Sequence, residues 1–187
     1  MREQHSPSFG KFLALLMIGL GLISVGVMFV FLMKDATGSL QDYSAIPSEM
    51  NYPAPELTLT DLSGNTVSLT DYRGTVVLVN LWATWCPPCR AEMPTLSKFY
   101  KKYREHGFEL IAINQEETLD VVQPFVDEFE LPFPVWLDLE YQAEKKFKTV
   151  NLPSSYVIDR TGQVRLLWIG EITYKRLEEF VSDIILE

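Results

Sequence analysis

The chain has 187 residues, of which 47% are hydrophobic and 22% are charged, and it carries a formal net charge of -9. These proportions are typical of a folded protein, and the length predicts one domain with an appendage. Because nucleic-acid binding needs a basic surface for the phosphates, the acidic charge argues against a nucleic-acid partner.

An apolar stretch without a charged residue runs over residues 12–33. About 20 such residues cross the ~30 Å hydrocarbon core of a bilayer as a helix. Lys11 and Lys34 flank the stretch, where they can reach the headgroups. A cleaved signal peptide usually has a shorter apolar region and a small-x-small cleavage site, and neither feature is present. The sequence therefore predicts an uncleaved, single-pass transmembrane anchor over residues 12–33.

The orientation of this anchor is predicted from the positive residues on its two sides. Arg2 and Lys11 precede the stretch, whereas after it Lys34 is alone until Arg73. Positive residues prefer the cytoplasmic side, so we expect residues 1–11 to be cytoplasmic and the rest of the chain to lie outside the cell membrane. We further expect a linker over residues 34–52 and one catalytic domain over residues 53–187.

Alternating strand and helix patterns fill the predicted domain. Polar and apolar residues alternate in two short segments around a turn cluster, which predicts a hairpin of residues 56–60 and 66–70. The near-continuous apolar run 75–82 predicts a strand buried on both faces. The later elements are a helix over 90–103, a strand over 108–113, a helix over 118–130, a strand over 134–138, a helix over 141–147, a hairpin of 155–159 and 163–168, and a helix over 174–186. This order predicts an α/β fold whose sheet ends in the antiparallel final hairpin.

The only two cysteines lie in the segment Cys86-Pro87-Pro88-Cys89, between the predicted buried strand and the next helix. At a helix N-terminus, unpaired N–H groups and the helix dipole stabilise a thiolate, which should lower the pKa of Cys86 below about 8.5. Prolines suit the first helical turn because its N–H groups have no partner there. Cys86 is thus predicted to attack a substrate disulfide, and Cys89 to resolve the mixed disulfide.

Other uses of two cysteines fit the sequence less well. A zinc site needs about four ligands, and the only histidines are His5 and His106. Covalent haem attachment needs a histidine after the second cysteine, where Arg90 stands. A structural disulfide closing so small a loop adds little stability. We therefore expect no metal and no cofactor beyond the redox-active Cys86–Cys89 disulfide, although two thiolates could also hold Cu(I).

The segment Trp85-Cys86-Pro87-Pro88-Cys89, preceded by Val79-Asn80-Leu81-Trp82-Ala83, resembles the thioredoxin superfamily. It is most similar to the membrane-anchored TlpA-like and ResA-like thiol–disulfide oxidoreductases. The preceding anchor, the N-terminal hairpin, Glu92 and Pro94 after the cysteines, and the extra helix and strand over 118–138 carry this closer match. The resemblance covers about residues 53–187. It implies a thioredoxin-like fold, with a central mixed sheet flanked by helices, an N-terminal β-hairpin and a central helix–strand insertion.

The resemblance also implies roles for two residues outside the motif. Residues 150–155 resemble the loop that holds a cis-proline, Pro153, facing the dithiol and leaving backbone free to pair with substrate. Glu92 resembles the family's carboxylate beside the active site, which helps to move protons. The alternative for Glu92 is a solvated acid in the first turns of a helix, which is favourable by itself.

Asn80 departs from the thioredoxin pattern, which has a buried aspartate at this position. A neutral amide cannot act as a base, so deprotonation of Cys89 would depend on Glu92 or on water. Trp85, Pro87 and Pro88 are expected to surround the active site, with Trp85 as a partly exposed wall. Trp82 is expected in the core.

The resemblance implies a disulfide reductase that acts on protein disulfides, such as those of apocytochrome c before haem attachment or of copper-site proteins. A membrane electron donor of the thiol-transfer type would reduce it again. From the residues alone, a thiol oxidase remains open, because the direction depends on the reduction potential. A dithiol Cu(I) chaperone also remains open. A peroxidase is less expected because no separate peroxidatic cysteine is present.

Overall fold

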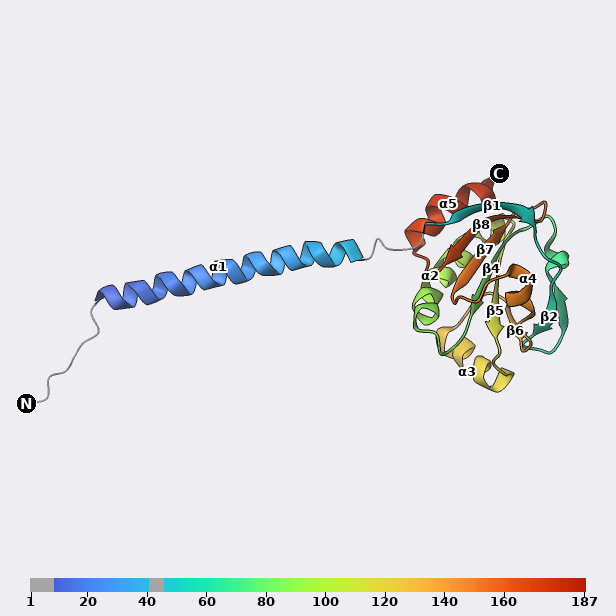
Figure 1. The fold of residues 1–187 in the computed structure, drawn as a ribbon, viewed down its shortest axis with the longest axis horizontal. Coiled ribbons are helices and arrows are strands. Elements are labelled where there is room, and N and C mark those ends of the chain that lie inside the picture. The colour runs from blue at the N-terminus through green and yellow to red at the C-terminus, as the bar shows by residue number, and fades with distance from the viewer. Residues whose placement is uncertain (1–8, 41–45) are drawn as a thin grey trace, which may run out of the picture. The chain divides into compact units, whose positions relative to one another are not determined.

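The apolar N-terminal stretch forms a long helix, α1 (Phe9–Leu40). The structure, a computed structural model, describes residues 9–40 and 46–187 (Figure 1). Within α1, Leu13–Val30 has a mean hydropathy of 2.6 and none of it is buried. Its 18 residues extend about 27 Å as a helix, close to the hydrocarbon thickness of a bilayer. By length and composition, α1 is the one helix of the described residues that could cross a membrane.

The helix α1 is longer than the anchor predicted over residues 12–33. The helix continues through residue 40 and so takes up part of the linker expected over 34–52. The other predictions for residues 1–8 and 41–45 lie outside the described residues. The chain divides into two units, Met1–Tyr43 and Ser44–Glu187, and the second holds all the remaining elements.

The second unit contains one eight-stranded sheet with the strand order β1-β8-β7-β4-β5-β6-β2-β3. β4, β5 and β6 are parallel to one another, and the other pairs are antiparallel, which confirms the mixed sheet. The strands are β1 (Ser48–Pro53), β2 (Thr58–Asp61), β3 (Thr66–Ser68), β4 (Val76–Trp82), β5 (Phe108–Gln115), β6 (Val135–Asp138), β7 (Ser154–Ile158) and β8 (Gln163–Ile169).

Helices cover both faces of this sheet. The core on one face includes residues of α2 (Pro87–Tyr103), α3 (Leu119–Phe129) and α5 (Tyr174–Leu186). The core on the other face includes residues of α4 (Gln142–Phe147) and of the 3-10 helix η1 (Leu69–Tyr72). A second 3-10 helix, η2 (Arg104–His106), follows α2 and ends at Gly107, whose φ of 73° suits glycine.

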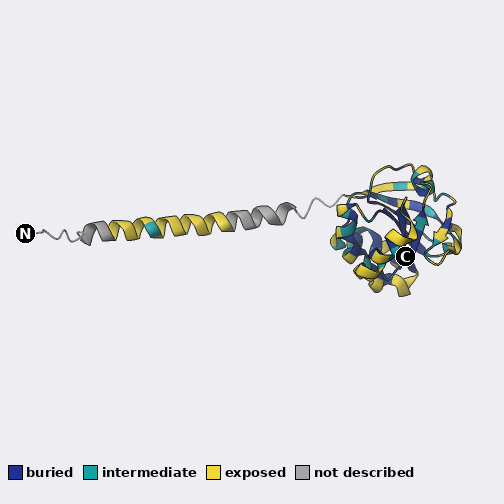
Figure 2. Cartoon of the chain, turned by 90° about the horizontal axis from the view of Figure 1, so that it is seen from below, coloured by how far each residue is buried: buried dark blue, intermediate teal, exposed yellow. Residues whose placement is uncertain are grey.

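β4 lies in the middle of the sheet and is buried along its whole length, as the apolar run predicted. Figure 2 shows the buried residues of this unit, in dark blue, mainly in its interior and the exposed ones, in yellow, on its periphery. The side chains of β4 alternate between the two cores. Val76, Leu78 and Trp82 pack on the side of α2, whereas Val77 and Leu81 pack on the other side. The same alternation directs Asn80 toward α2, where the active-site helix begins.

The predicted domain start at residue 53 is wrong. All of β1 except Pro53 lies within the expected linker 34–52, and β1 pairs antiparallel with β8, with Ser48 opposite Leu167. The final hairpin, β7–β8, is therefore inside the sheet, and β1 forms the edge. The sequence hides β1 because an edge strand with mostly exposed residues shows no apolar alternation, and Pro53 is typical of such edges.

The N-terminal hairpin and the central insertion are confirmed, and they meet at the other edge of the sheet. β2 pairs with β3, with Thr58 opposite Ser68. β2 also pairs with β6, the strand of the insertion, with Thr60 opposite Leu137. The hairpin therefore continues the sheet beyond β6. The sequence predicted both parts but not their pairing, because the register joins segments more than 70 residues apart.

Candidate active site

The junction between β4 and α2 places both cysteines at the start of a helix. Cys86 is the N-cap of α2, and Pro87 and Pro88 take the first two helical positions. Cys86 and Cys89 form a disulfide, and the Cys86 Sγ accepts the N–H of Cys89 at 3.3 Å. Cys86 retains 3% of its exposure, whereas Cys89 is fully buried. The motif predicted this placement of the pair at the start of a helix, and Cys86 is the more exposed residue of the two.

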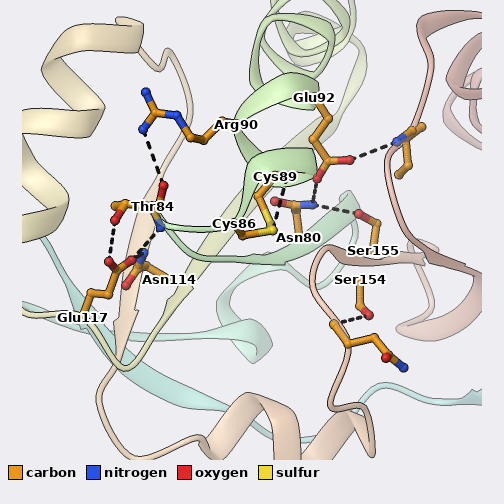
Figure 3. Close-up of a disulfide and its surroundings, with 12 residues drawn as sticks. Asn80, Thr84, Cys86, Cys89, Arg90, Glu92, Asn114, Glu117, Ser154 and Ser155 are labelled. Carbon is orange, nitrogen blue, oxygen red and sulfur yellow. Dashed lines mark hydrogen bonds between the residues drawn. A yellow bond between two sulfur atoms is a disulfide. The ribbon is translucent and has the colours of Figure 1, made fainter.

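Glu92 lies one helical turn after Cys89 and is fully buried. Its Oε1 accepts the side-chain N–H of Asn80 at 2.8 Å, and its Oε2 accepts the backbone N–H of Ile172 at 3.0 Å (Figure 3). Burial raises the pKa of Glu92 to about 8, although both hydrogen bonds oppose the shift. The interpretation of Glu92 as a solvated acid is therefore wrong, and the carboxyl is enclosed beside the dithiol.

Asn80 connects Glu92 to the neighbouring strand. Its Nδ2 also donates to the Oγ of Ser155 on β7, at 2.9 Å. The Oδ1 of Asn80 is buried without a hydrogen-bond partner among the described residues. When Glu92 is protonated, its O–H group needs a hydrogen-bond acceptor. The unpaired Oδ1 of Asn80 is an acceptor on the same amide that donates to Glu92. At the position where the thioredoxin pattern has a buried aspartate, this chain has an amide that donates a hydrogen bond to Glu92.

The peptide bond between Leu152 and Pro153 is cis, as the resemblance implied. Pro153 directly precedes β7, whose first residue, Ser154, is opposite Leu81 of β4. Because β7 is antiparallel to β4, Pro153 lies at the end of β4 from which the cysteine loop leaves. The Oγ of Ser154 donates to the backbone oxygen of Asn151 at 2.7 Å, which braces this loop.

A hydrogen-bonded cluster that the sequence did not predict fixes the turn before the cysteines. The carboxylate of Glu117 accepts the backbone N–H of Thr84 at 2.7 Å, the Thr84 hydroxyl, and the side-chain N–H of Asn114 at 2.8 Å (Figure 3). Thr84 and Glu117 are 33 residues apart, and no local pattern relates them. They meet because β4 and β5 are parallel, with Trp82 opposite Asn114.

A cavity of about 370 Å³ opens beside the disulfide. Trp85 is on its wall and 69% exposed, whereas Trp82 is fully buried, as predicted for both. The residues that line the cavity are Trp85, Cys86, Pro87, Pro88, Gln115, Glu116, Tyr141, Glu144, Val150 and Leu152. Six of these (Gln115, Glu116, Tyr141, Glu144, Val150 and Leu152) were not among the predicted site residues. Among the described residues, no group of three or more His, Cys, Asp or Glu side chains could hold a metal ion.

Comparison with known proteins identifies the family. Residues 50–167 match the model of the AhpC/TSA family, which is thioredoxin-like. The chain belongs to this family. It is 40% identical to the thiol–disulfide oxidoreductase ResA of Bacillus thuringiensis over 136 residues, which cover 73% of this chain and 79% of that protein. It is 37% identical to ResA of Geobacillus kaustophilus over 131 residues, which cover 70% of this chain and 75% of that protein.

Solved structures agree with this membership. The chain resembles a thiol:disulfide interchange protein DsbE of Chlorobium tepidum, with a TM-score of 0.69, 29% identity and coverage of 73% of this chain and 98% of that one. It also resembles a thioredoxin of Neisseria meningitidis, with a TM-score of 0.65, 32% identity and coverage of 70% and 88%. With its cysteine pair, this AhpC/TSA family member is a thiol–disulfide oxidoreductase of the ResA and DsbE type.

Replacing Glu92 by Gln should change how the stability of the domain depends on pH. The unfolded carboxyl ionises near pH 4.5 and the folded one near pH 8, so Glu92 lowers the free energy of unfolding progressively as pH rises through this interval. The whole change is roughly 3–5 kcal/mol. Urea unfolding from pH 5 to 8.5 should therefore show a downward slope in the wild type that Glu92→Gln removes.

The exposed Glu105 supplies the matched control, and Glu105→Gln should keep the wild-type slope. Stability curves of wild type and Glu92→Gln that run parallel over this pH range would show that Glu92 ionises at its ordinary pKa.

Proposed function

We propose that this protein is a disulfide reductase that is anchored in the cell membrane by α1 and acts outside the cytoplasm. The apolar Leu13–Val30 segment and the name shared by the ResA relatives support the anchored oxidoreductase. The excess of positive residues before the segment supports a cytoplasmic N-terminus. The Cys86–Cys89 pair carries the electrons, and no other cofactor is needed.

The reaction is thiol–disulfide exchange in two steps. The Cys86 thiolate attacks one sulfur of the substrate disulfide, that bond breaks, and the first substrate thiolate leaves and takes up a proton. The Cys89 thiolate then attacks the Cys86 sulfur and releases the second substrate thiol. Two electrons pass to the substrate, and the enzyme is left with the Cys86–Cys89 disulfide. Exchange with a reduced dithiol of a membrane donor restores it.

Glu92 is proposed to exchange the proton of Cys89. The two residues are three positions apart on α2, so their side chains are neighbours on the same helix face. A general base works best when its pKa lies near the pH at which the enzyme operates. Burial raises the pKa of Glu92 to about 8, close to the value of about 8.5 for a free thiol. Pro153 would present substrate to Cys86, and Trp85, Pro87 and Pro88 would form the contact surface.

The acidic surroundings of the disulfide are the observation that carries the reductase direction. Glu116 and Glu144 line the cavity, and Glu117 binds the turn before the cysteines. No Lys, Arg or His in the described part of the chain lines the cavity. Negative charge disfavours a thiolate and so favours the disulfide form of the pair. Strong oxidants of this fold have the opposite bias, because their reduced form is stabilised.

The clients that we propose are protein disulfides outside the membrane, and apocytochrome c before haem attachment is the first to test. The donor that we propose is a membrane protein of the thiol-transfer type. Support for both comes from the ResA-like character of the chain, whose relatives are named thiol–disulfide oxidoreductases.

The Cys89→Ser variant should accumulate the mixed disulfide. In this variant Cys86 can attack but nothing resolves the adduct, so reaction of the reduced protein with a disulfide-bonded peptide should give a covalent complex seen by mass spectrometry. Cys86→Ser is the matched control and should give at least tenfold less adduct, because Cys89 is fully buried. Equal adduct in both variants would contradict the assigned order of attack.

Labelling of intact cells should report orientation and direction together. If the domain is outside and held reduced, a membrane-impermeant maleimide should label the wild type directly, and the Cys86→Ser/Cys89→Ser double variant should stay unlabelled. Labelling only after permeabilisation would contradict the orientation. Labelling only after external reduction would show that the pair is oxidised at steady state, as in a thiol oxidase.

A further inference from the structure

The cavity beside the disulfide combines apolar walls with hydrogen-bond acceptors. Trp85 is 69% exposed and Val150 is 81% exposed, and Leu152, Pro87 and Pro88 complete the apolar part. The charged residues on its lining are Glu116 and Glu144, both acids. Apolar walls with a few converging polar groups are typical of ligand sites.

The two carboxylates come from separate segments. Glu116 follows β5 directly, and Glu144 lies in α4. They come to one cavity because β5 pairs with β6, with Gln115 opposite Asp138, and Asp138 leads into α4. Among the described residues, neither carboxylate has a hydrogen bond or an ion pair with another side chain. Both acceptors are thus left for a ligand.

Gln115 adds an independent observation at the same cavity. It is 3% exposed and lines the cavity, and its Nε2 donates to Asp138 Oδ2 at 3.3 Å. Because a carboxylate only accepts, this bond fixes which end of the amide faces Asp138. The opposite end, Oε1, is buried and has no partner among the described residues. A buried acceptor without a donor indicates a missing hydrogen-bond partner.

Among the described residues, no lysine or arginine forms an ion pair with Glu116 or Glu144. On α4, the Nζ of Lys145 donates to the backbone oxygen of Glu140, and the Nζ of Lys146 donates to that of Glu56. On α2, Arg90 contacts Glu128 and the faces of Phe125 and Phe129.

We propose that this cavity binds a lysine or arginine side chain that flanks the reacting cysteine of the client polypeptide. The apolar stem of such a side chain packs on Trp85, Val150 and Leu152, and its charged head donates to Glu116 and Glu144. The long basic side chains fit because they join an apolar stem to a donor-only head. The inference rests on the proposed function, since it names the clients that the disulfide acts on, and it holds for either direction of electron flow.

Exchange kinetics with matched peptides test the inference. The reduced full-length protein in detergent is mixed with three disulfide-bonded peptides that differ at one position beside the cysteine, which holds lysine, norleucine or glutamate. The lysine peptide should react about five- to tenfold faster than the glutamate peptide at low salt, and the ratio should shrink as salt rises. In the Glu116→Gln/Glu144→Gln variant the ratio should fall to about one to two.

The Glu105→Gln/Glu179→Gln variant is the control, because it removes the same charge from two exposed positions that do not line this cavity. It should keep the wild-type ratio. Equal rates with all three peptides in the wild type, or the same loss of preference in both double variants, would overturn the inference while leaving the oxidoreductase intact. Absence of exchange with every peptide would instead overturn the proposed function and the inference with it.

Discussion

The hydrogen bond between Asn80 and Glu92 is the contact that ties the active-site helix to the centre of the sheet. β4 is buried on both faces, so its alternation leaves one polar side chain, Asn80, directed at α2. Glu92 accepts the side-chain N–H of Asn80 and also the backbone N–H of Ile172, which precedes α5. Three parts of the chain therefore meet at one enclosed carboxyl, one turn from Cys89. A buried carboxyl is stable there only because both of its oxygens are hydrogen-bonded.

This constraint shapes the chemistry of the dithiol. Cys89 and Glu92 are both fully buried, so Glu92 is placed to accept a proton from the thiol inside the protein. Burial raises the pKa of Glu92 to about 8, which suits the proton exchange with Cys89 that we propose. Glu116, Glu117 and Glu144 lie around the pair, and their negative charge disfavours a thiolate.

Local sequence patterns were enough for the parts of the fold and site that depend on neighbouring residues. The apolar run of β4, the placement of Cys86 and Cys89 at a helix start and the two hairpins follow from such patterns, and the cis bond before Pro153 followed from family resemblance. Glu92 was ambiguous because a buried and a solvated acid in the first turns of a helix have the same sequence. β1, the Glu117–Thr84 bond and the Gln115–Asp138 pair depend on contacts between distant segments, and no local period marks them.

The reduction potential of the Cys86/Cys89 pair tests the central claim most directly. The full-length protein in detergent would be equilibrated with thiol buffers of defined potential at pH 7, and the dithiol fraction measured by alkylation. Acidic surroundings that favour the disulfide predict a potential of about -270 mV or below, close to that of thioredoxin. A potential near about -120 mV, that of a strong disulfide-forming oxidant, would contradict the reductase.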